Sequence, residues 1–243
     1  MKFSLFEGGV HTPAFIWSPM IANRSRIHND YLHITDWLPT FYNLAGGDIE
    51  DLGQIDGVDQ WNSISKGTRG PRNTLLLNLD EHDHSGGAIK GRFKYLTAAW
   101  ERNGSYFGDN ADDGDSSAPP YNVASVINSM AGRAIASVTG NVRVGSEEIL
   151  DLRRANKVRC APHTVQSSCS ISCLFDLVAD PCETTDVSAG NQNVVKELDE
   201  ILTDYWKVLV PQLEPGIDVR GFPDHKGGAW LPWLTADGLP LKQ

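Results

Sequence analysis

Apolar residues recur at helical spacing in two parts of the chain. Between 36 and 45, one helical face collects the apolar residues Trp37, Leu38, Phe41, Leu44 and Ala45. Asp36 is the expected N-cap, and Gly46-Gly47 supplies the C-terminal stop. A longer series precedes Pro211: Val194, Val195, Leu198, Ile201, Leu202, Tyr205, Val208 and Leu209. The two patterns predict a short amphipathic helix and a long one of about 18 residues.

Short apolar runs elsewhere indicate β-strands. The run from Thr12 to Trp17 ends at Ser18-Pro19 and predicts a buried strand. Thr74 to Leu79 predicts a central strand, and Gly91 predicts the turn of a hairpin. The other strand candidates are 88–90, 93–98, 149–158 and 174–178. We therefore expect a mixed α/β chain in which the long helix packs on one face of an antiparallel sheet.

Polar stretches rich in glycine and proline suggest how the chain is divided. Residues 48–73 are typical of a passage between domains, and the region of about 101–145 is a polar excursion to which no element is assigned. The tail lacks any periodicity. The predicted division is an α/β domain end at 1–73, a sheet and helix domain at 74–213, and an irregular tail at 214–243.

Composition narrows the classes of function. With 243 residues, 40% hydrophobic and 21% charged, the chain is typical of an ordinary globular protein. A net charge of −10 argues against nucleic acid as the main partner. No apolar run approaches the roughly 20 residues of a membrane helix, so no membrane partner is expected. Glu7 and the glycines after it interrupt the apolar start, so no signal peptide is expected either.

Four cysteines lie close together, at Cys160, Cys169, Cys173 and Cys182. Their spacing does not match a zinc site, and an even number in one segment favours two local disulfides and hence a secreted or lysosomal protein. Three pairings are possible. Cys160 with Cys169 and Cys173 with Cys182 is preferred because each bond closes a short loop, while four buried reduced thiols are the alternative.

Two sequons fit a secreted protein. Asn23 begins Asn-Arg-Ser and Asn103 begins Asn-Gly-Ser, so both are candidate glycosylation sites.

The first candidate site is at the N-terminus, where Lys2 precedes Glu7-Gly8-Gly9. Glycine adopts positive φ without steric strain, so this segment could form a loop that places the ammonium group of Lys2 at the end of a sheet. The simpler interpretation is that Lys2, like most lysines, is solvated.

A second candidate is Glu81-His82-Asp83-His84, directly after a predicted strand. A histidine titrates near neutral pH, so His82 or His84 could contact a substrate or exchange a proton with it. Two histidines make an incomplete metal site, and no metal is predicted there. The acidic run from Asp109 to Asp115 fails as a calcium loop at Ala111 and Pro120. No nucleotide-binding loop or nucleophile elbow is present.

Three motifs, in order, resemble the sulfatase family, most nearly its arylsulfatase B branch. They are Lys2-Phe-Ser-Leu-Phe-Glu7-Gly8-Gly9-Val10, then His33-Ile-Thr-Asp36-Trp37-Leu38-Pro39-Thr40, then Leu174-Phe175-Asp176-Leu177 with Asp180-Pro181-Cys182-Glu183. The likeness covers roughly 1–100 and 149–243. It implies the C-terminal part of an alkaline-phosphatase-like α/β fold, followed by a smaller antiparallel sheet with a long helix.

The resemblance also implies an activity, hydrolysis of sulfate esters on glycosaminoglycans or aryl sulfates in the lysosome. Family members use a formylglycine made from Cys-x-Pro-x-Arg and a calcium ion, and a lysine before Glu-Gly-Gly binds the sulfate. That role falls on Lys2, whereas His11 stands where the family usually has arginine. None of the four cysteines lies in Cys-x-Pro-x-Arg, and the calcium ligands of the family are not in this chain.

The chain is therefore expected to be inactive alone and to need no cofactor of its own. A truncated non-catalytic product, such as a glycan-binding module, is the alternative, and the net charge of −10 disfavours binding to sulfated glycans. An incomplete gene product with no function of its own is a third interpretation.

Overall fold

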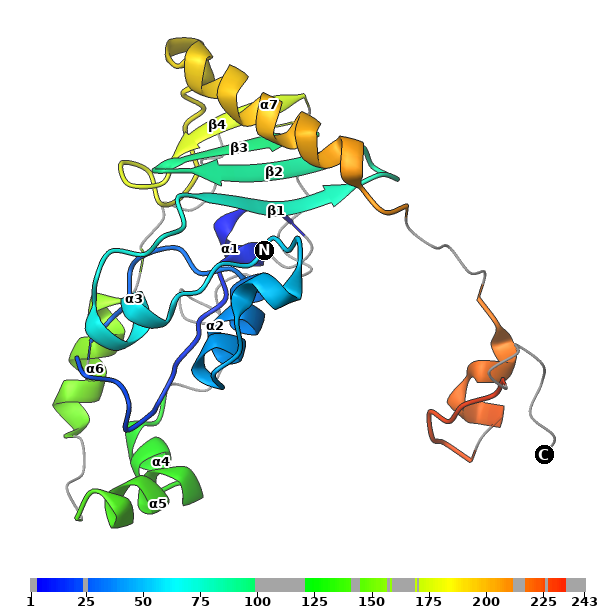
Figure 1. Cartoon of the computed structure of the whole chain (residues 1–243). Helices are drawn as coiled ribbons and strands as arrows, with labels where there is room; N and C mark the ends of the chain where they lie inside the picture. The colour runs from blue at the N-terminus through cyan, green and yellow to red at the C-terminus, as the bar shows by residue number, and fades with distance from the viewer. Residues whose placement is uncertain are drawn as a thin grey trace. The chain divides into compact units, whose positions relative to one another are not determined.

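The computed structural model describes residues 4–23, 26–98, 121–140, 145–156, 158, 169, 171–211, 217–225 and 227–234 (Figure 1). The chain divides into two units, residues 1–208 and 209–243. Among the described residues, no helix combines the length and the apolar character needed to cross a bilayer.

A four-stranded antiparallel sheet forms the centre of the first unit. Its strands are β1 (Thr74–Asp80), β2 (Ser85–Lys90), β3 (Phe93–Thr97) and β4 (Ser172–Asp176), in the order β1-β2-β3-β4. The predicted hairpin is confirmed, because β2 and β3 pair around Gly91, whose φ of +57° suits glycine. The predicted central strand is wrong in its position, since β1 lies at an edge of the sheet.

The long helix α7 (Gln192–Val208) covers one face of this sheet (Figure 1). Leu198 and Leu202 project from α7 into a buried cluster with Ala88, Tyr95 and Leu174 from three of the strands. This burial of apolar side chains is the main stabilising contact between helix and sheet. The predicted antiparallel sheet packed on a long helix is confirmed.

The opposite face of the sheet packs against the N-terminal segment and a disulfide. Leu96 and Phe175 form a buried cluster with Cys169 and Cys173, and Leu5 and Phe6 pack against it. Because Cys169 and Cys173 are bonded to each other, the predicted pairing of Cys160 with Cys169 and of Cys173 with Cys182 is wrong. Their Cα atoms are 5.3 Å apart, which suits a disulfide, so the shorter loop closes.

The predicted strand at 12–17 is also wrong. The segment forms neither helix nor strand, and its aromatic side chains face solvent, with Phe15 96% and Trp17 78% exposed. The preceding residues form one helical turn, α1 (Glu7–Val10), so Gly8 and Gly9 do not use the positive φ that was expected of them. The apolar composition of 12–17 indicated burial, but no neighbouring strand pairs with it here.

Residues 149–158 were predicted to be a strand, but residues 149–155 of this range belong to the helix α6 (Ser146–Ala155). Glu147 and Glu148 lie in its first turn, while Arg153 and Arg154 lie in its last turn. This distribution of charge complements the helix dipole and favours a helix. The polar excursion contributes two more helices, α4 (Val123–Ile127) and α5 (Met130–Val138).

The predicted short helix is confirmed as α2 (Trp37–Leu44), which follows the 3-10 helix η1 (Ile34–Asp36). The apolar face of α2 is not its buried face. Leu38 and Phe41 are more than half exposed, whereas Pro39 and Thr40 are buried. The other helices among the described residues of the first unit are η2 (Ile49–Leu52), α3 (Trp61–Lys66) and η4 (Ser188–Gly190).

The second unit has two short 3-10 helices, η5 (Val219–Gly221) and η6 (Pro223–His225). Asp218 links its parts, since it accepts a hydrogen bond from Trp233 Nε1 at 2.9 Å and pairs with Arg220. These bonds hold the pKa of Asp218 far below its ordinary value, with Arg220 as the main cause.

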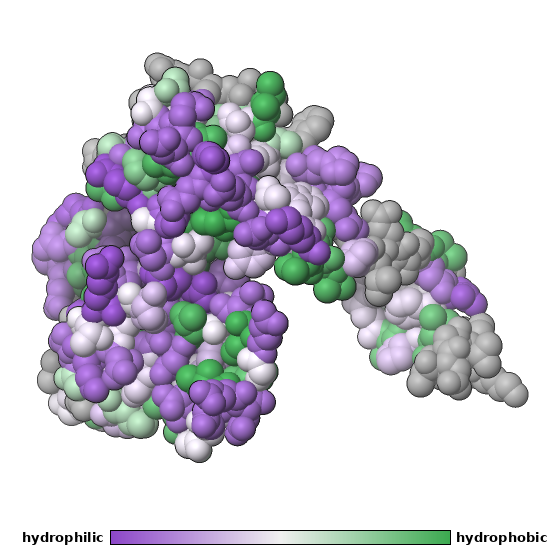
Figure 2. All heavy atoms as spheres, turned by 45° about the horizontal axis from the view of Figure 1, so that its top comes forward, coloured by the Kyte–Doolittle hydropathy of each residue, from purple (hydrophilic) through white to green (hydrophobic). Residues whose placement is uncertain are grey.

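Exposed apolar side chains generate a testable expectation. Figure 2 shows hydrophobic spheres scattered among hydrophilic ones on the face in view. Since Phe15 and Trp17 are largely exposed, we expect the isolated chain to bind the dye anilinonaphthalene sulfonate. The double variant Phe15→Ser/Trp17→Ser should roughly halve the dye fluorescence, with a change in stability of only about 0.5 kcal/mol. Lys196→Ser/Asp204→Ser is the control, and equal dye binding by all three proteins would contradict the expectation.

Candidate functional site

A buried lysine fastens the N-terminal acidic segment to the sheet. Lys94 on β3 is fully buried, with Nζ 3.0 Å from Glu7 Oε1 and 2.7 Å from Glu183 Oε1. The backbone N–H of Glu7 donates a further bond to Glu183 Oε2 at 2.6 Å. One ammonium therefore serves two carboxylates that lie 176 residues apart in sequence. We call Lys94, Glu7 and Glu183 the Lys94 cluster.

The strand and the turn that carry this cluster explain its geometry. Lys94 and Leu96 point to the same face of β3 because side chains alternate along a strand, so Lys94 enters the face covered by the N-terminal segment. Asp180 holds the turn before Glu183 by accepting N–H bonds from Thr184 and Thr185, at 2.7 and 2.8 Å. A charge buried in this way is tolerated only when it is paired.

The two carboxylates of the Lys94 cluster lie in different electrostatic environments. Burial raises the pKa of Glu183 above its ordinary value, although the charge of Lys94 and the Glu7 N–H act in the opposite direction. At the exposed rim, His11 Nδ1 lies 2.8 Å from Glu7 Oε2.

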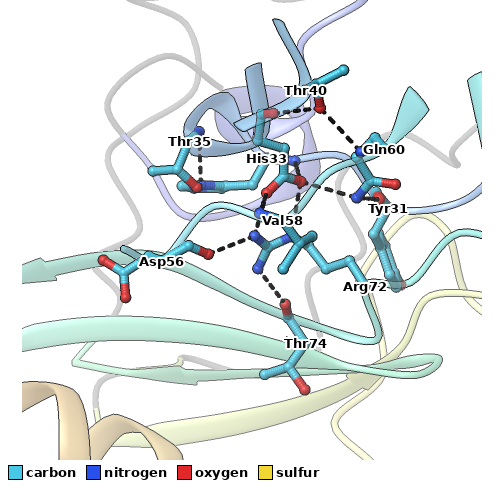
Figure 3. Close-up of polar contacts among 10 residues, drawn as sticks. Tyr31, His33, Thr35, Thr40, Asp56, Val58, Gln60, Arg72 and Thr74 are labelled. Carbon is cyan, nitrogen blue, oxygen red and sulfur yellow. Dashed lines mark hydrogen bonds and ion pairs between the residues drawn. The ribbon is translucent and has the colours of Figure 1, made fainter. Parts of the chain in front are cut away.

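A second buried ionic group surrounds Asp36 (Figure 3). The Asp36 carboxylate is fully buried and accepts bonds from Arg72 Nε at 2.9 Å, His33 N at 2.9 Å, Val58 N at 3.0 Å and Gln60 Nε2 at 3.1 Å. Arg72 Nη2 bonds its other oxygen as well. Burial alone would raise the pKa of Asp36, but these donors together hold it below its ordinary value. We call this group the Asp36 cluster.

The Asp36 cluster joins segments that are distant in sequence. Arg72 also donates to the carbonyl oxygens of Asp56, at 2.8 Å, and Thr74, at 3.2 Å. The hydroxyl of Thr40 donates to Asp36 O and accepts from the N–H of Gln60. Asp36 was predicted to cap α2, but its side chain makes no such bond and instead accepts the N–H of His33 across η1.

The candidate histidines lie in the turn between β1 and β2. His82 and His84 are exposed, and His84 has a φ of +50°. Asp80 shapes the turn by accepting the N–H of His82 at 2.9 Å and that of Asp83 at 3.1 Å. The turn closes a hairpin at the sheet edge, whereas the sequence suggested the end of a central strand. A role in substrate contact remains a prediction.

The other candidates are distributed as follows. Lys2, Asn103 and Cys160 lie outside the described residues. Asn23 is exposed, and its backbone N–H bonds to Ser65 O at 2.9 Å. Cys182 is disulfide-bonded, as are Cys169 and Cys173. Within the described ranges, no group of three or more His, Cys, Asp or Glu side chains is arranged to hold a metal ion.

Sequence reasoning missed Lys94, Glu183 and Arg72 as partners in these clusters. Lys94 gave one usable signal, because it shares an inward-facing strand position with Leu96 in an otherwise apolar strand. A charge at such a position requires a buried counter-charge. Nothing local in the sequence identifies which carboxylates provide it.

The Asp36 cluster leads to a stability prediction. Asp36→Asn should lower the free energy of unfolding by about 3–5 kcal/mol at pH 7, because it leaves the Arg72 charge buried without its counter-ion. The lowered pKa of Asp36 means that its contribution is present above the unfolded-state pKa and is lost as pH falls through the folded-state pKa. The deficit of the variant measured by urea unfolding should therefore shrink in acid. Asp204→Asn, in an exposed pair with Lys207, is the control. An equal loss for both variants would contradict this account.

Comparison with known proteins gives a sequence match to an arylsulfatase. No family model matches the chain. Mouse (Mus musculus) arylsulfatase J is 30% identical over 246 residues, an alignment that covers 99% of this chain and 37% of arylsulfatase J. A solved chain described under the metabolism of multiple glycosaminoglycans by Bacteroides thetaiotaomicron is 16% identical, with a TM-score of 0.35. That match covers 70% of this chain and 24% of the solved one, and a TM-score this low supports no argument.

The sequence match to arylsulfatase J extends over both ionic clusters and the sheet. This chain spans little more than a third of the length of that relative. The chain is similar in sequence to this arylsulfatase over nearly its whole length.

Proposed function

We propose that this chain is the C-terminal part of an arylsulfatase B-like enzyme that hydrolyses sulfate esters of glycosaminoglycans. The observation that carries the proposal is that Glu7 and Glu183 both form ion pairs with the ammonium group of Lys94. Glu7 and Glu183 belong to the first and the third of the motifs that resemble sulfatases, and the fold joins them in space. Residues 1–73 then correspond to the end of the catalytic domain, 74–213 to the smaller domain and 214–243 to a tail.

Lys2 has the sulfate-binding role in this proposal. It precedes Glu7 by only five residues, so the Lys94 cluster restrains the segment that leads to it. An ammonium at this point would neutralise the charge that develops on the sulfate and on the leaving oxygen. His82 and His84 are proposed as weaker contacts with the sugar or aryl part of the substrate.

The nucleophile must come from residues that this chain does not supply. None of its cysteines lies in a Cys-x-Pro-x-Arg sequence, and three of them are disulfide-bonded. The calcium ion of the family finds no fitting set of ligands among the described residues, so we assign it no step here. We therefore propose that the isolated chain does not turn over.

A lysosomal or secreted location accompanies this proposal. Disulfides persist in oxidising compartments, and Asn23 is exposed as a glycosylation acceptor must be. Asn103 is proposed as a second acceptor. The substrate would be a sulfated glycan, with aryl sulfates as artificial substitutes.

The test compares the isolated chain with a longer product and two variants of it in a fluorogenic aryl-sulfate assay with calcium. The isolated chain should give no turnover above the blank. A longer product, whose transcript encodes an in-frame Cys-x-Pro-x-Arg before this chain, should be active. In that product, Lys2→Ala should lower kcat/KM by about 100-fold or more, because it removes a charge aimed at the reacting group.

Lys196→Ala is the matched control, since Lys196 is 79% exposed on the outer surface of α7. Calcium-dependent turnover by the isolated chain would overturn its proposed inactivity. Full activity of Lys2→Ala would overturn the assignment of Lys2. Retention of the isolated chain on a chondroitin sulfate column, with no active longer product, would instead favour a glycan-binding module.

A further inference from the structure

The helix α2 turns its apolar side chains away from the interior of the chain. Ile34, Leu38 and Phe41 recur at helical spacing along η1 and α2, and they are 75%, 56% and 52% exposed. A surface helix of a globular protein normally buries its apolar side and exposes its polar side. In α2 the apolar side is instead left without a covering element among the described residues. We call Ile34, Leu38 and Phe41 the α2 outer face.

Polar contacts on the inner side of α2 fix this orientation. The Thr40 hydroxyl donates to Asp36 O at 2.6 Å and accepts the N–H of Gln60 at 3.0 Å, and both side chains are buried. A rotation of α2 that buried the outer face would break these bonds and withdraw the Asp36 carboxylate from Arg72. Each buried polar group that loses its partner is costly. The chain therefore does not cover the outer face by repacking α2.

The outer face is ordered and free of charge. The ring of Trp37 stacks on that of Phe41 with centroids 5.3 Å apart, which restricts the position of the Phe41 ring. The sequence of α2 contains no charged residue, and in Figure 1 the helix lies beyond β1, on the far side of the sheet from α7. Depletion of charge and an ordered aromatic side chain are typical of the buried centre of a protein–protein contact.

The size of the outer face limits which partner can cover it. With eight residues at about 1.5 Å each, α2 is about 12 Å long. A stable complex between separate chains buries about 800 Å² on each partner, which is more than one side of so short a helix provides. A net charge of −10 also opposes the close approach of a second copy. A partner in the same polypeptide needs no such area, because the linkage gives it a high effective concentration.

The relative found by sequence comparison is long enough to contain such a linked partner. Its alignment covers 99% of this chain but 37% of arylsulfatase J, so the part of arylsulfatase J outside the alignment is longer than the part inside it. The α2 outer face lies within the second of the three motifs that resemble sulfatases, at 33–40, and in the residue that follows it.

We propose that the α2 outer face is an internal contact of a sulfatase domain, covered by an apolar element encoded before residue 1 in the same polypeptide. The proposal rests on the proposed function, because it takes this chain as the C-terminal part of a longer enzyme. The covering element is apolar where it meets Leu38 and Phe41, and it brings no unpaired charge into the contact. Through Asp36 and Arg72, the contact connects the preceding part of the enzyme to the start of the sheet.

Hydroxyl-radical footprinting of the native side chains tests this contact without any substitution. The two proteins are the isolated chain and the longer product with an in-frame Cys-x-Pro-x-Arg, both at low concentration. Oxidation of Phe41 should be about tenfold slower in the longer product, because a half-exposed ring becomes almost completely buried. Trp230, which is 73% exposed in the second unit, is the internal reference and should be oxidised at similar rates in the two proteins.

A double substitution separates the exposed state of this face from the covered one. In the isolated chain, Ile34→Gln/Leu38→Gln replaces two exposed side chains, so Tm should change by less than about 2 °C. In the longer product the same change places two amide groups in an apolar contact, so Tm should fall by about 4 °C or more. Lys196→Gln on α7 is the control, and it should change Tm by less than about 2 °C in both proteins.

Equal oxidation of Phe41 in the two proteins, or an equal shift of Tm for the double variant in both, would overturn the contact. Protection of Phe41 that appears in the isolated chain when its concentration rises about a hundredfold would overturn it in favour of a second copy. If the double variant of the longer product does not fold, footprinting of the unsubstituted proteins still decides the question.

The aryl-sulfate assay keeps this test separate from that of the proposed function. A longer product that protects Phe41 but shows no turnover contradicts the proposed activity and supports the contact. Turnover by a longer product in which Phe41 is oxidised as fast as in the isolated chain supports the activity and contradicts the contact.

Discussion

The structure of the first unit depends on how it accommodates one buried ammonium. Lys94 projects from β3 into the buried contact between the sheet and the N-terminal segment, where an unpaired charge would be strongly destabilising. The fold satisfies it with Glu7 from the N-terminal segment and Glu183 from the turn after β4. Because neither carboxylate is near Lys94 in sequence, this single requirement brings the beginning of the chain, the sheet and the connection to α7 together.

The Asp36 cluster does the same for the segment between α1 and the sheet. Arg72, two residues before the start of β1, holds the buried Asp36 carboxylate and also bonds the main chain at 56 and 74. The two clusters contain residues from all three motifs that resemble sulfatases, namely Glu7, Asp36 and Glu183. In this chain these residues hold segments together. Similarity to an arylsulfatase thus extends over a chain in which no cysteine lies in Cys-x-Pro-x-Arg.

Local patterns predicted the elements whose cause is local. The helical spacing from Val194 to Val208 predicted α7, and Gly91 between two apolar runs predicted the β2–β3 hairpin. The run around Ile149 suggested a strand, although acidic residues before it and arginines after it indicated the helix α6. Apolar composition at 12–17 suggested burial, but a strand also needs a hydrogen-bonded neighbour, which a local pattern does not reveal.

The polar clusters could not be predicted because their cause is long-range. Asp36 preceded a clear helix and was expected to cap it, while its real partner, Arg72, lies 36 residues further on. The Cys169–Cys173 disulfide likewise depends on how both cysteines pack against Leu96 and Phe175, and not on cysteine spacing alone. What the sequence did contain was the anomaly itself, a lysine at an inward position of β3.

The most direct test of the central role of Lys94 is a double-mutant cycle for the free energy of unfolding at pH 7. The cycle comprises Lys94→Met, Glu183→Gln and the double variant. If Lys94 and Glu183 are buried partners, Glu183→Gln should recover part of the loss caused by Lys94→Met, with a coupling energy of at least about 1 kcal/mol. Additive effects, within about 0.5 kcal/mol, would contradict the account.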